Sequence, residues 1–405
     1  MYFSAAEKFK KSFRADSEYV PFMLSVLALG LAYGIQKGIL DNYLAEIVSM
    51  TEFDRGVAEF FRELPGLLLV LILAACYTMP AEKLYKLGAV VMLAGTALLG
   101  IVPPSKALVT LAVFIYEIGD HVQLGMKNTL ALEYAAEGQS GAAQGYLNSA
   151  NQIGHLMGFV IIIVSFLFVS GSKPYKLFFL ISAAVSLVGM LISFKLKGNS
   201  ETDKSKSRFY FRKKFKKYYM LEVFYGARKQ VFFTFGPYVL ILFYGASATV
   251  ISLLFAISAI AGFIMAPVVG RIIDRFGYRI VMIADTLILV IVCFFYGFAH
   301  HIFPMNIAFI VCCVNYVLDS VISLAAMASN VYVQDIGDSQ EEIRATISTG
   351  ISVNHMITIL IALFGGWIWQ VLGVETLFIL SAVLGLCNSA YAATIEKKPR
   401  EINSV

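Results

Sequence analysis

Residues 270–279 read Gly-Arg-Ile-Ile-Asp-Arg-Phe-Gly-Tyr-Arg, a short charged stretch between two long apolar runs at 246–269 and 279–299. Each run is long enough to cross a bilayer, which takes about 20 predominantly apolar residues. The same alternation of apolar runs and short polar connections extends in both directions over most of the chain. The sequence therefore predicts an all-α membrane protein.

Twelve such runs are present. We expect transmembrane helices at 20–47, 55–77, 86–102, 107–131, 142–169, 174–194, 218–243, 246–269, 279–299, 303–327, 344–370 and 375–395. The composition agrees, because 59% of the residues are hydrophobic and 15% charged, against about 45–50% and about 25% in a soluble domain.

One connection is long and basic, and it divides six helices from six. The predicted domains are therefore a tail at 1–19, a six-helix bundle at 20–194, a linker at 195–217, a second bundle at 218–395 and a tail at 396–405.

The positions of the basic residues predict an orientation. With both termini in the cytoplasm, 23 of the 32 Lys and Arg residues fall on the cytoplasmic side. Only Arg55, Lys106, Lys173 and Lys176 fall outside, and five more lie within predicted helices. Because cytoplasmic loops carry the excess of Lys and Arg, we expect an integral inner-membrane protein with cytoplasmic termini.

The two halves repeat each other. The stretch Tyr33-Gly34-Ile35-Gln36-Lys37 in the first helix has a counterpart in Tyr225-Gly226-Ala227-Arg228-Lys229 in the seventh. Two further matches fall in the same order: Glu117, Asn128 and Glu133 against Asp319, Asn330 and Asp335, and Gln152 with His155 against Asn354 with His355. Internal repeats of this kind are typical of secondary transporters.

Residues 270–279 resemble the G-x-x-x-D-R-x-G-x-R signature of the major facilitator superfamily. This resemblance implies two pseudo-symmetric six-helix bundles around a central cavity and transport by alternating access. It also implies a cytoplasmic gate built by Gly270, Asp274, Arg275, Gly277 and Arg279. The first-half copy at 81–88 is degraded, so we expect the gate to depend on the second-half copy, in the loop between helices 8 and 9.

Ionisable residues within the predicted helices mark a candidate site, because each costs about 2.5–3.5 kcal/mol to insert. The candidate substrate-binding residues are Arg62, Arg228, Lys37, Lys229, Gln36, Tyr33, Tyr225, Gln152, His155, Asn354 and His355. Arginine holds a carboxylate or phosphate through two parallel hydrogen bonds, which favours Arg62 and Arg228 as contacts for an anionic group. Static salt bridges are the alternative for each, since buried charges are normally paired.

The acidic residues predict proton coupling. A carboxylate removed from water holds a proton more readily than one in water. Glu117 and Asp319 are the favoured residues, and the other candidates are Asp120, Glu63 and His121. The alternative is permanent pairing with Lys37 and Lys229. Asp41 also lies one helical turn from Lys37 and is able to pair with it.

Other residues suggest no second chemistry. His300 and His301 fall in an outer loop, where we expect solvation, and Asp285 is assigned to the gate. The cysteines lie within apolar runs and no nucleophile–base motif is present. We therefore expect no enzyme, cofactor, bound metal or nucleic acid.

The predicted function is secondary transport of a small polar or anionic organic solute by a proton-coupled monomer in the lipid bilayer. The alternatives are a drug–proton efflux antiporter, a metal or metal-chelate transporter, or a receptor-like relative that does not transport. The efflux motif G-x-x-x-G-P-x-x-G-G is incomplete here, because Gly154 and Gly158 are followed by neither the proline nor the glycine pair.

Overall fold

The computed structural model describes residues 5–76, 79–168, 173–197 and 211–396, most of them in helices. The helices of the first half are α1 (Ala5–Lys11), α2 (Tyr19–Glu46), α3 (Glu52–Ala75), α4 (Ala81–Ile101), α5 (Lys106–Tyr134), α6 (Ser140–Leu167) and α7 (Tyr175–Ser193). Those of the second half are η1 (Lys213–Phe215), α8 (Lys216–Leu242), α9 (Ala248–Phe276), α10 (Tyr278–Ile302), α11 (Met305–Ile322), η2 (Ser323–Ala326), α12 (Met327–Ile336), α13 (Gln340–Leu372) and α14 (Val374–Ala393).

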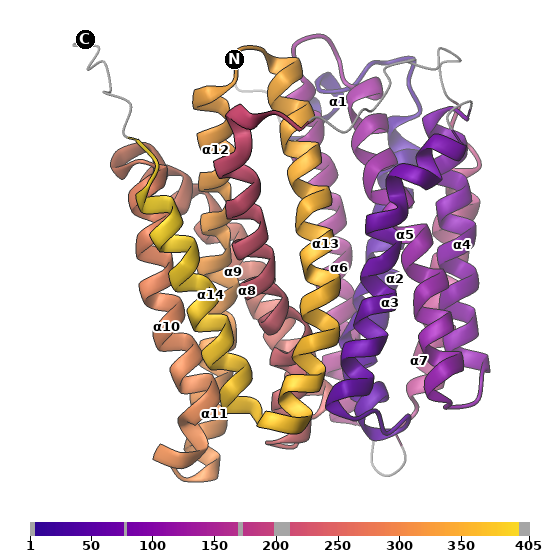
Figure 1. The fold of residues 1–405 in the computed structure, drawn as a ribbon. Coiled ribbons are helices and arrows are strands. Elements are labelled where there is room, and N and C mark those ends of the chain that lie inside the picture. Colours follow the sequence, from indigo (N-terminus) through magenta and orange to yellow (C-terminus); the bar gives the residue numbers. More distant parts are fainter. Residues whose placement is uncertain (1–4, 77–78, 169–172, 198–210, 397–405) are drawn as a thin grey trace. The chain divides into compact units, whose positions relative to one another are not determined.

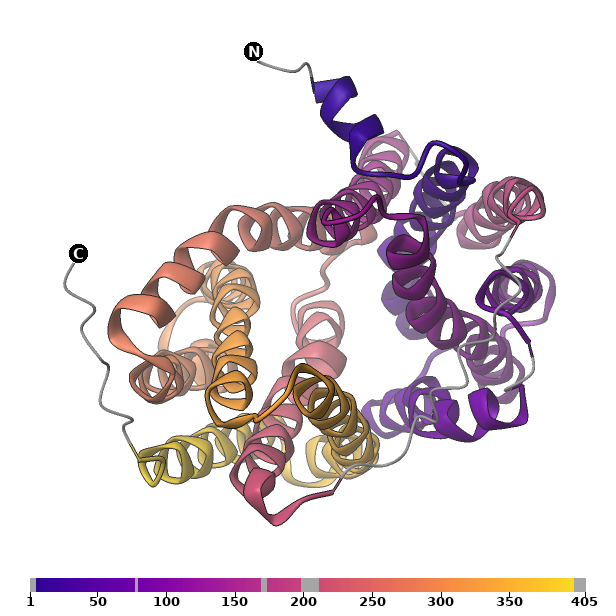
Figure 2. The same cartoon turned by 90° about the horizontal axis from the view of Figure 1, so that it is seen from above.

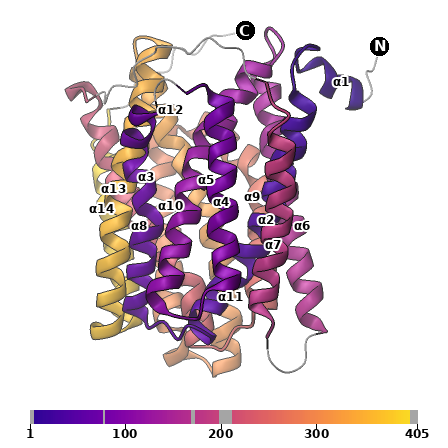
Figure 3. The ribbon, with the colours of Figure 1, turned by 90° about the vertical axis from the view of Figure 1, so that its right-hand side faces the viewer.

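The chain divides into two compact units. Unit 1 comprises Met1–Lys206 and Gly245–Ala259, and unit 2 comprises Ser207–Tyr244 and Ile260–Val405. In unit 1, α2, α4 and α6 run in one direction and α3, α5 and α7 in the other, so consecutive helices are antiparallel (Figure 1). Figure 2 looks along the helices, and Figure 3 shows α4 packed beside α5. In unit 2, α8 packs against both α13 and α14.

The expectation of an all-α protein with twelve long helical segments is confirmed in the described residues. Ten of these segments are long and apolar enough to cross a membrane by composition alone. The two that fall short are α3 and α8. Both carry several charged residues in a helix of membrane-spanning length, and both contribute to the candidate site described below.

Two predicted loops are helical. Residues 270–276 form the last turns of α9, and Gly277 alone separates α9 from α10. Gly277 has a φ of 84°, a conformation that glycine adopts without the penalty of a Cβ atom. In the first half, residues 81–88 form the start of α4. The prediction of a loop at 270–279 is therefore wrong, because a single glycine suffices to reverse the chain. The linker residues 198–210, most of the C-terminal tail and residues 1–4 lie outside the described residues.

One helix predicted at 303–327 is interrupted. The helix α11 ends at Ile322, the 3₁₀ turn η2 follows it, and α12 then continues to Ile336. The hydroxyl of Tyr225 on α8 donates a hydrogen bond to the carbonyl of Ser323 in this turn. That bond satisfies a backbone oxygen at the interruption, as a buried carbonyl requires. The repeat-related helix α5 runs without interruption from Lys106 to Tyr134.

Glycines bring α2 and α6 into backbone contact. A Cβ atom on Gly30 would lie 2.8 Å from the carbonyl oxygen of Asn151, and one on Gly158 would lie 2.5 Å from the nitrogen of Ile35. Gly34 and Gly154 are equally crowded by the opposite backbone. Small residues four apart allow such close approach between membrane helices.

Candidate functional site

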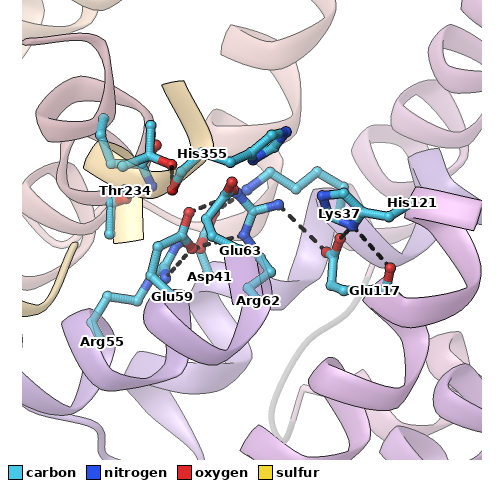
Figure 4. Close-up of polar contacts among 12 residues, drawn as sticks. Lys37, Asp41, Arg55, Glu59, Arg62, Glu63, Glu117, His121, Thr234 and His355 are labelled. Atoms are coloured by element: carbon cyan, nitrogen blue, oxygen red, sulfur yellow. Dashed lines mark hydrogen bonds and ion pairs between the residues drawn. The ribbon is translucent and has the colours of Figure 1, made fainter. Parts of the chain in front are cut away.

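One face of α3 carries an alternating series of charges. Arg55, Glu59, Arg62 and Glu63 share this face, because residues three and four apart on a helix are neighbours (Figure 4). Arg55 Nη1 donates to Glu59 Oε2 at 2.7 Å. Arg62 binds Glu59 through Nε and Nη2 at 2.8 and 2.6 Å, and Nη2 also contacts Glu63. Glu59 is fully buried between the two arginines.

Helices α2 and α5 extend this series at its two ends. On α2, Lys37 Nζ lies 2.9 Å from Asp41 Oδ2, so the pairing expected from their spacing is present. Asp41 Oδ1 lies 3.2 Å from Arg55 Nη2. On α5, Glu117 lies 3.4 Å from Arg62 Nη1 and 3.6 Å from His121 Nδ1. We call these eight residues, Lys37, Asp41, Arg55, Glu59, Arg62, Glu63, Glu117 and His121, the unit 1 network.

The unit 1 network holds more carboxylates than cations. Three cations (Lys37, Arg55 and Arg62) meet four carboxylates (Asp41, Glu59, Glu63 and Glu117). When His121 is neutral, the network has a net charge of −1 with every carboxylate ionised. Because an uncompensated buried charge is costly, one proton on His121 or on a carboxylate brings the network to neutrality.

Unit 1 contains two small cavities. The first adjoins the network, has a volume of about 20 Å³ and is lined by Tyr33, Gln36, Lys37, Arg62, Tyr116 and Glu117 among others. That is room for about one water molecule. The second has a volume of about 190 Å³, and its polar lining comprises Tyr33, Asp120, Gln123, Lys127, Asn151 and His155.

The remaining site residues predicted for unit 1 separate into groups. Tyr33 lines both cavities, and its ring lies 4.4 Å from that of His155, centroid to centroid. Asp120 lines the second cavity with His155 rather than joining the network. Gln36 is buried and accepts a hydrogen bond from Thr96 at 2.8 Å. Gln152 is exposed on α6 and lines neither cavity.

In unit 2, Arg228 of α8 is buried, with 3% of its surface exposed. Its Nη2 forms an ion pair with Asp285 of α10. Its guanidinium carbon lies 4.9 Å from the ring centroid of Tyr225. Among the described residues, Nη1 of Arg228 has no hydrogen-bond partner. A buried arginine with an unused donor is able to bind an acceptor on a ligand.

Asp319 of α11 is buried, yet within the described part of the chain its carboxylate forms neither a hydrogen bond nor an ion pair. Arg228 and Lys229 act on it electrostatically without direct contact, and the side chain of Lys229 is exposed. Asp319 therefore differs from its repeat counterpart Glu117, which contacts Arg62 directly.

A second carboxylate of unit 2 forms hydrogen bonds only with neutral side chains, as far as the described residues show. Glu222 of α8 accepts hydrogen bonds from Ser329 at 2.8 Å and from Asn354 at 3.3 Å. His355 follows Asn354 on α13 and is partly buried. Unit 2 therefore places Asn354 on a carboxylate that the sequence reasoning did not select.

The predicted gate residues lie at one end of unit 2. Asp274 and Arg275 are exposed in the last turn of α9, and Arg275 lies 5.3 Å from the ring centroid of Phe276. Gly270 is in open space within α9, and Gly277 forms the turn before Arg279. Their role in gating stays a prediction.

Four charged residues of the two units were not predicted in their observed roles. Arg55 was not among the predicted site residues, but it is 3% exposed and pairs with Asp41 and Glu59. Glu59 lies three residues before Arg62 and four after Arg55, and this spacing was a usable signal. Asp285 was assigned to the gate, whereas it pairs with Arg228. Glu222 lies four residues before Gly226, near the start of the helix predicted at 218–243, and it was not predicted as a site residue.

Comparison with known proteins finds one family model that matches the second half of the chain and several solved structures of similar fold. Residues 218–404 match the family model described as Major Facilitator Superfamily. The chain is similar to the solved nucleoside transporter NupG, with 16% identity, a TM-score of 0.72 and coverage of 94% of this chain and 99% of the other. It is also similar to a D-xylose-proton symporter, with 14% identity and a TM-score of 0.68. A bacterial homologue of the human lysosomal transporter Spinster, in an inward-facing, occupied conformation, is similar with 13% identity and a TM-score of 0.68. Each of these two matches covers 93% of this chain and 96% of the other. No curated protein matches the chain.

Proposed function

We propose that this chain is a proton-coupled secondary transporter of a small polar solute, of the major facilitator superfamily whose model matches residues 218–404. The match to the family model and the similar fold of solved transporters support an integral membrane transporter. The coupling ion, the solute class and the residues that serve them are our proposal, and they rest on the buried charges of the two units.

Asp319 is the proposed proton carrier, and the observation that carries the proposal is that no described residue contacts its buried carboxylate directly. An ionised carboxylate that is buried without a cation in contact is costly. Asp319 therefore gains more from accepting a proton than Glu117 does, since Glu117 already contacts Arg62. A group that gains a proton in one access state and loses it in the other couples solute movement to the pH gradient.

Arg228 is the proposed solute contact. Among the described residues its Nη1 is an unused guanidinium donor in unit 2, whereas Arg62 is already bound by three carboxylates. A strongly anionic solute is disfavoured at the unit 1 network, which is already rich in carboxylates. A neutral solute with several hydroxyl groups suits a site that offers both donors and acceptors. Two solved proteins of similar fold are named as a nucleoside transporter and a D-xylose-proton symporter, which supports this class.

The test is uptake of radiolabelled uridine and D-xylose into proteoliposomes, with and without a pH gradient. We expect at least one probe to accumulate when the outside is acidic, and a protonophore to abolish the accumulation. Counterflow without a gradient should persist, because it needs exchange and no net proton movement. Equal uptake with and without the gradient, for a probe that shows counterflow, would exclude proton coupling.

We also propose that both termini face the cytoplasm, on the distribution of Lys and Arg. Single cysteines placed at Ser105 and at Glu137, in a background without native cysteines, should label from opposite sides. Both positions are exposed, and they lie at opposite ends of α5. In whole cells we expect an impermeant maleimide to label position 105 and not position 137. The reverse pattern would invert the orientation.

A further inference from the structure

The end of α10 and the start of α14 bring two histidines and a glutamate together in unit 2. The prediction that His300 and His301 lie in a loop is wrong, because both belong to the last turn of α10. Glu375 lies in the first turn of α14. Nitrogen and oxygen atoms of all three side chains lie within 4.8 Å of one another. The two imidazole rings are 3.9 Å apart, centroid to centroid.

The distances fit a tetrahedral metal ion. His300 Nε2 lies 3.3 Å from Glu375 Oε1, and His301 Nε2 lies 3.0 Å from the same oxygen. Zinc binds imidazole nitrogen and carboxylate oxygen at about 2.0–2.2 Å, so two ligands of a tetrahedral zinc ion are about 3.3 Å apart. Side-chain movements of a few tenths of an ångström would therefore admit the ion.

The surrounding residues hold the three side chains in place. Gly373 has a φ of 92°, and a Cβ atom at this position would lie 2.7 Å from Glu375 Oε2. The ring of Phe243 lies 4.6 Å from that of His300, centroid to centroid. The side chain of His300 is 13% exposed and that of His301 is 58% exposed. His300 is thus fixed beneath an aromatic ring, while His301 leaves a path from the solvent.

A purely structural role explains only part of this arrangement. Glu375 in the first turn of α14 stabilises the helix dipole, but that role requires no imidazole. A hydrogen bond to the carboxylate needs one histidine, whereas both ring nitrogens converge on the same oxygen. Two neutral imidazoles and one carboxylate are a ligand set that zinc uses in proteins, with water in the fourth position.

We propose that His300, His301 and Glu375 form a binding site for a divalent transition-metal ion, with zinc as the best fit. The ion would link the end of α10 to the start of α14, two helices that already pack along their length. The site shares no residue with the proposed solute contact Arg228 or the proposed proton carrier Asp319.

Zinc binding to the purified, untagged full-length chain in detergent tests this directly. Calorimetric titration should show one equivalent bound, and zinc should raise the apparent melting temperature by mass action. His301→Ala and Glu375→Gln should each weaken zinc binding by about tenfold or more, since each removes one of three protein ligands. Glu46→Gln is the matched control. It removes another carboxylate at a helix end, one that pairs with Lys173 and contacts no histidine in the described part of the chain.

Cobalt as a spectroscopic probe separates this site from binding by cysteine. We expect the visible absorption of a tetrahedral cobalt ion without a sulfur charge-transfer band, and its loss in the His300→Ala, His301→Ala double variant. A charge-transfer band that survives this double variant would place the ion on cysteine and overturn the proposal. Equal zinc affinity in the parent chain and in Glu375→Gln would also overturn it, as would the absence of saturable zinc binding to the folded parent chain.

Discussion

Buried charge is handled differently in the two units. In unit 1, three cations and four carboxylates form one connected series across α2, α3 and α5. In unit 2, one ion pair joins Arg228 to Asp285, while Asp319 has no direct partner in the described residues and Glu222 has only neutral ones. Glu117 and Asp319, which occupy equivalent positions in the two repeats, therefore have different surroundings. The buried charges of unit 1 are joined in one network, whereas Asp319 of unit 2 has no direct partner among the described residues.

The largest expected effect concerns stability. Glu59→Gln should lower the free energy of unfolding by about 3–5 kcal/mol, because it leaves two buried arginines without their shared carboxylate. The measurement is reversible unfolding in detergent followed by circular dichroism. Glu46→Gln, at a partly exposed ion pair with Lys173, should cost at most about 1 kcal/mol. Equal losses in the two variants would show that the unit 1 network is not the stabilising element described here.

The next effect distinguishes the two repeat-related acids. A pH gradient of one unit is worth about 1.4 kcal/mol, or about a tenfold concentration ratio. Asp319→Asn should reduce gradient-driven accumulation to the equilibrium level and retain counterflow. Glu117→Gln should retain most of the accumulation, since its carboxylate is already bound to Arg62. The opposite result, with accumulation lost only in Glu117→Gln, would move the proton site to unit 1.

A smaller effect is expected for solute affinity. Arg228→Lys keeps the positive charge but loses the planar donor fork. We expect solute binding to weaken by about 1 kcal/mol, or roughly fivefold. Competition by unlabelled solute in the counterflow assay measures it. Arg62→Lys is the matched control, and it should alter stability more than affinity. If only Arg62→Lys weakens binding, the solute contact lies in the unit 1 network.

The smallest effect concerns the interrupted helix. Tyr225→Phe removes the hydrogen bond to the Ser323 carbonyl and should cost about 0.5–1.5 kcal/mol of stability. Unfolding in detergent measures this loss. Tyr33→Phe, the repeat-related change, has no such interruption to support in unit 1, so it should cost less. A larger loss in Tyr33→Phe would contradict the role given to this hydrogen bond.

Features that depend on local spacing were predictable from the sequence. The apolar runs predicted the helices because a bilayer sets their length. The pair between Lys37 and Asp41 followed from a separation of four residues. The series on α3 had the same signal of residues three and four apart, but only Arg62 and Glu63 of it were predicted as site residues.

Features that depend on packing between helices were not predictable. Arg228 and Asp285 are 57 residues apart and meet only because α8 and α10 belong to one unit. The sequence gives no signal for the 3₁₀ turn at residues 323–326, because residues 322–327 contain neither proline nor glycine, the residues that commonly interrupt a helix. The meeting of His300, His301 and Glu375 likewise required the arrangement of α10 and α14.

The glycines between α2 and α6 have a mechanical consequence. At these glycines the two backbones touch, so no side chain lies between them that could change its rotamer. We therefore expect α2 and α6 to move together as one rigid body, and Lys37 on α2 to move with His155 on α6. In unit 2, a Cβ atom on Gly226 would meet the side chain of Asn354 at 2.8 Å, and one on Gly350 would meet that of Tyr218. At these two glycines the contact between α8 and α13 is therefore made by side chains, which can change rotamer, and not by backbone. We therefore expect helices to shift against each other more easily in unit 2, the unit that also contains the unused donor of Arg228.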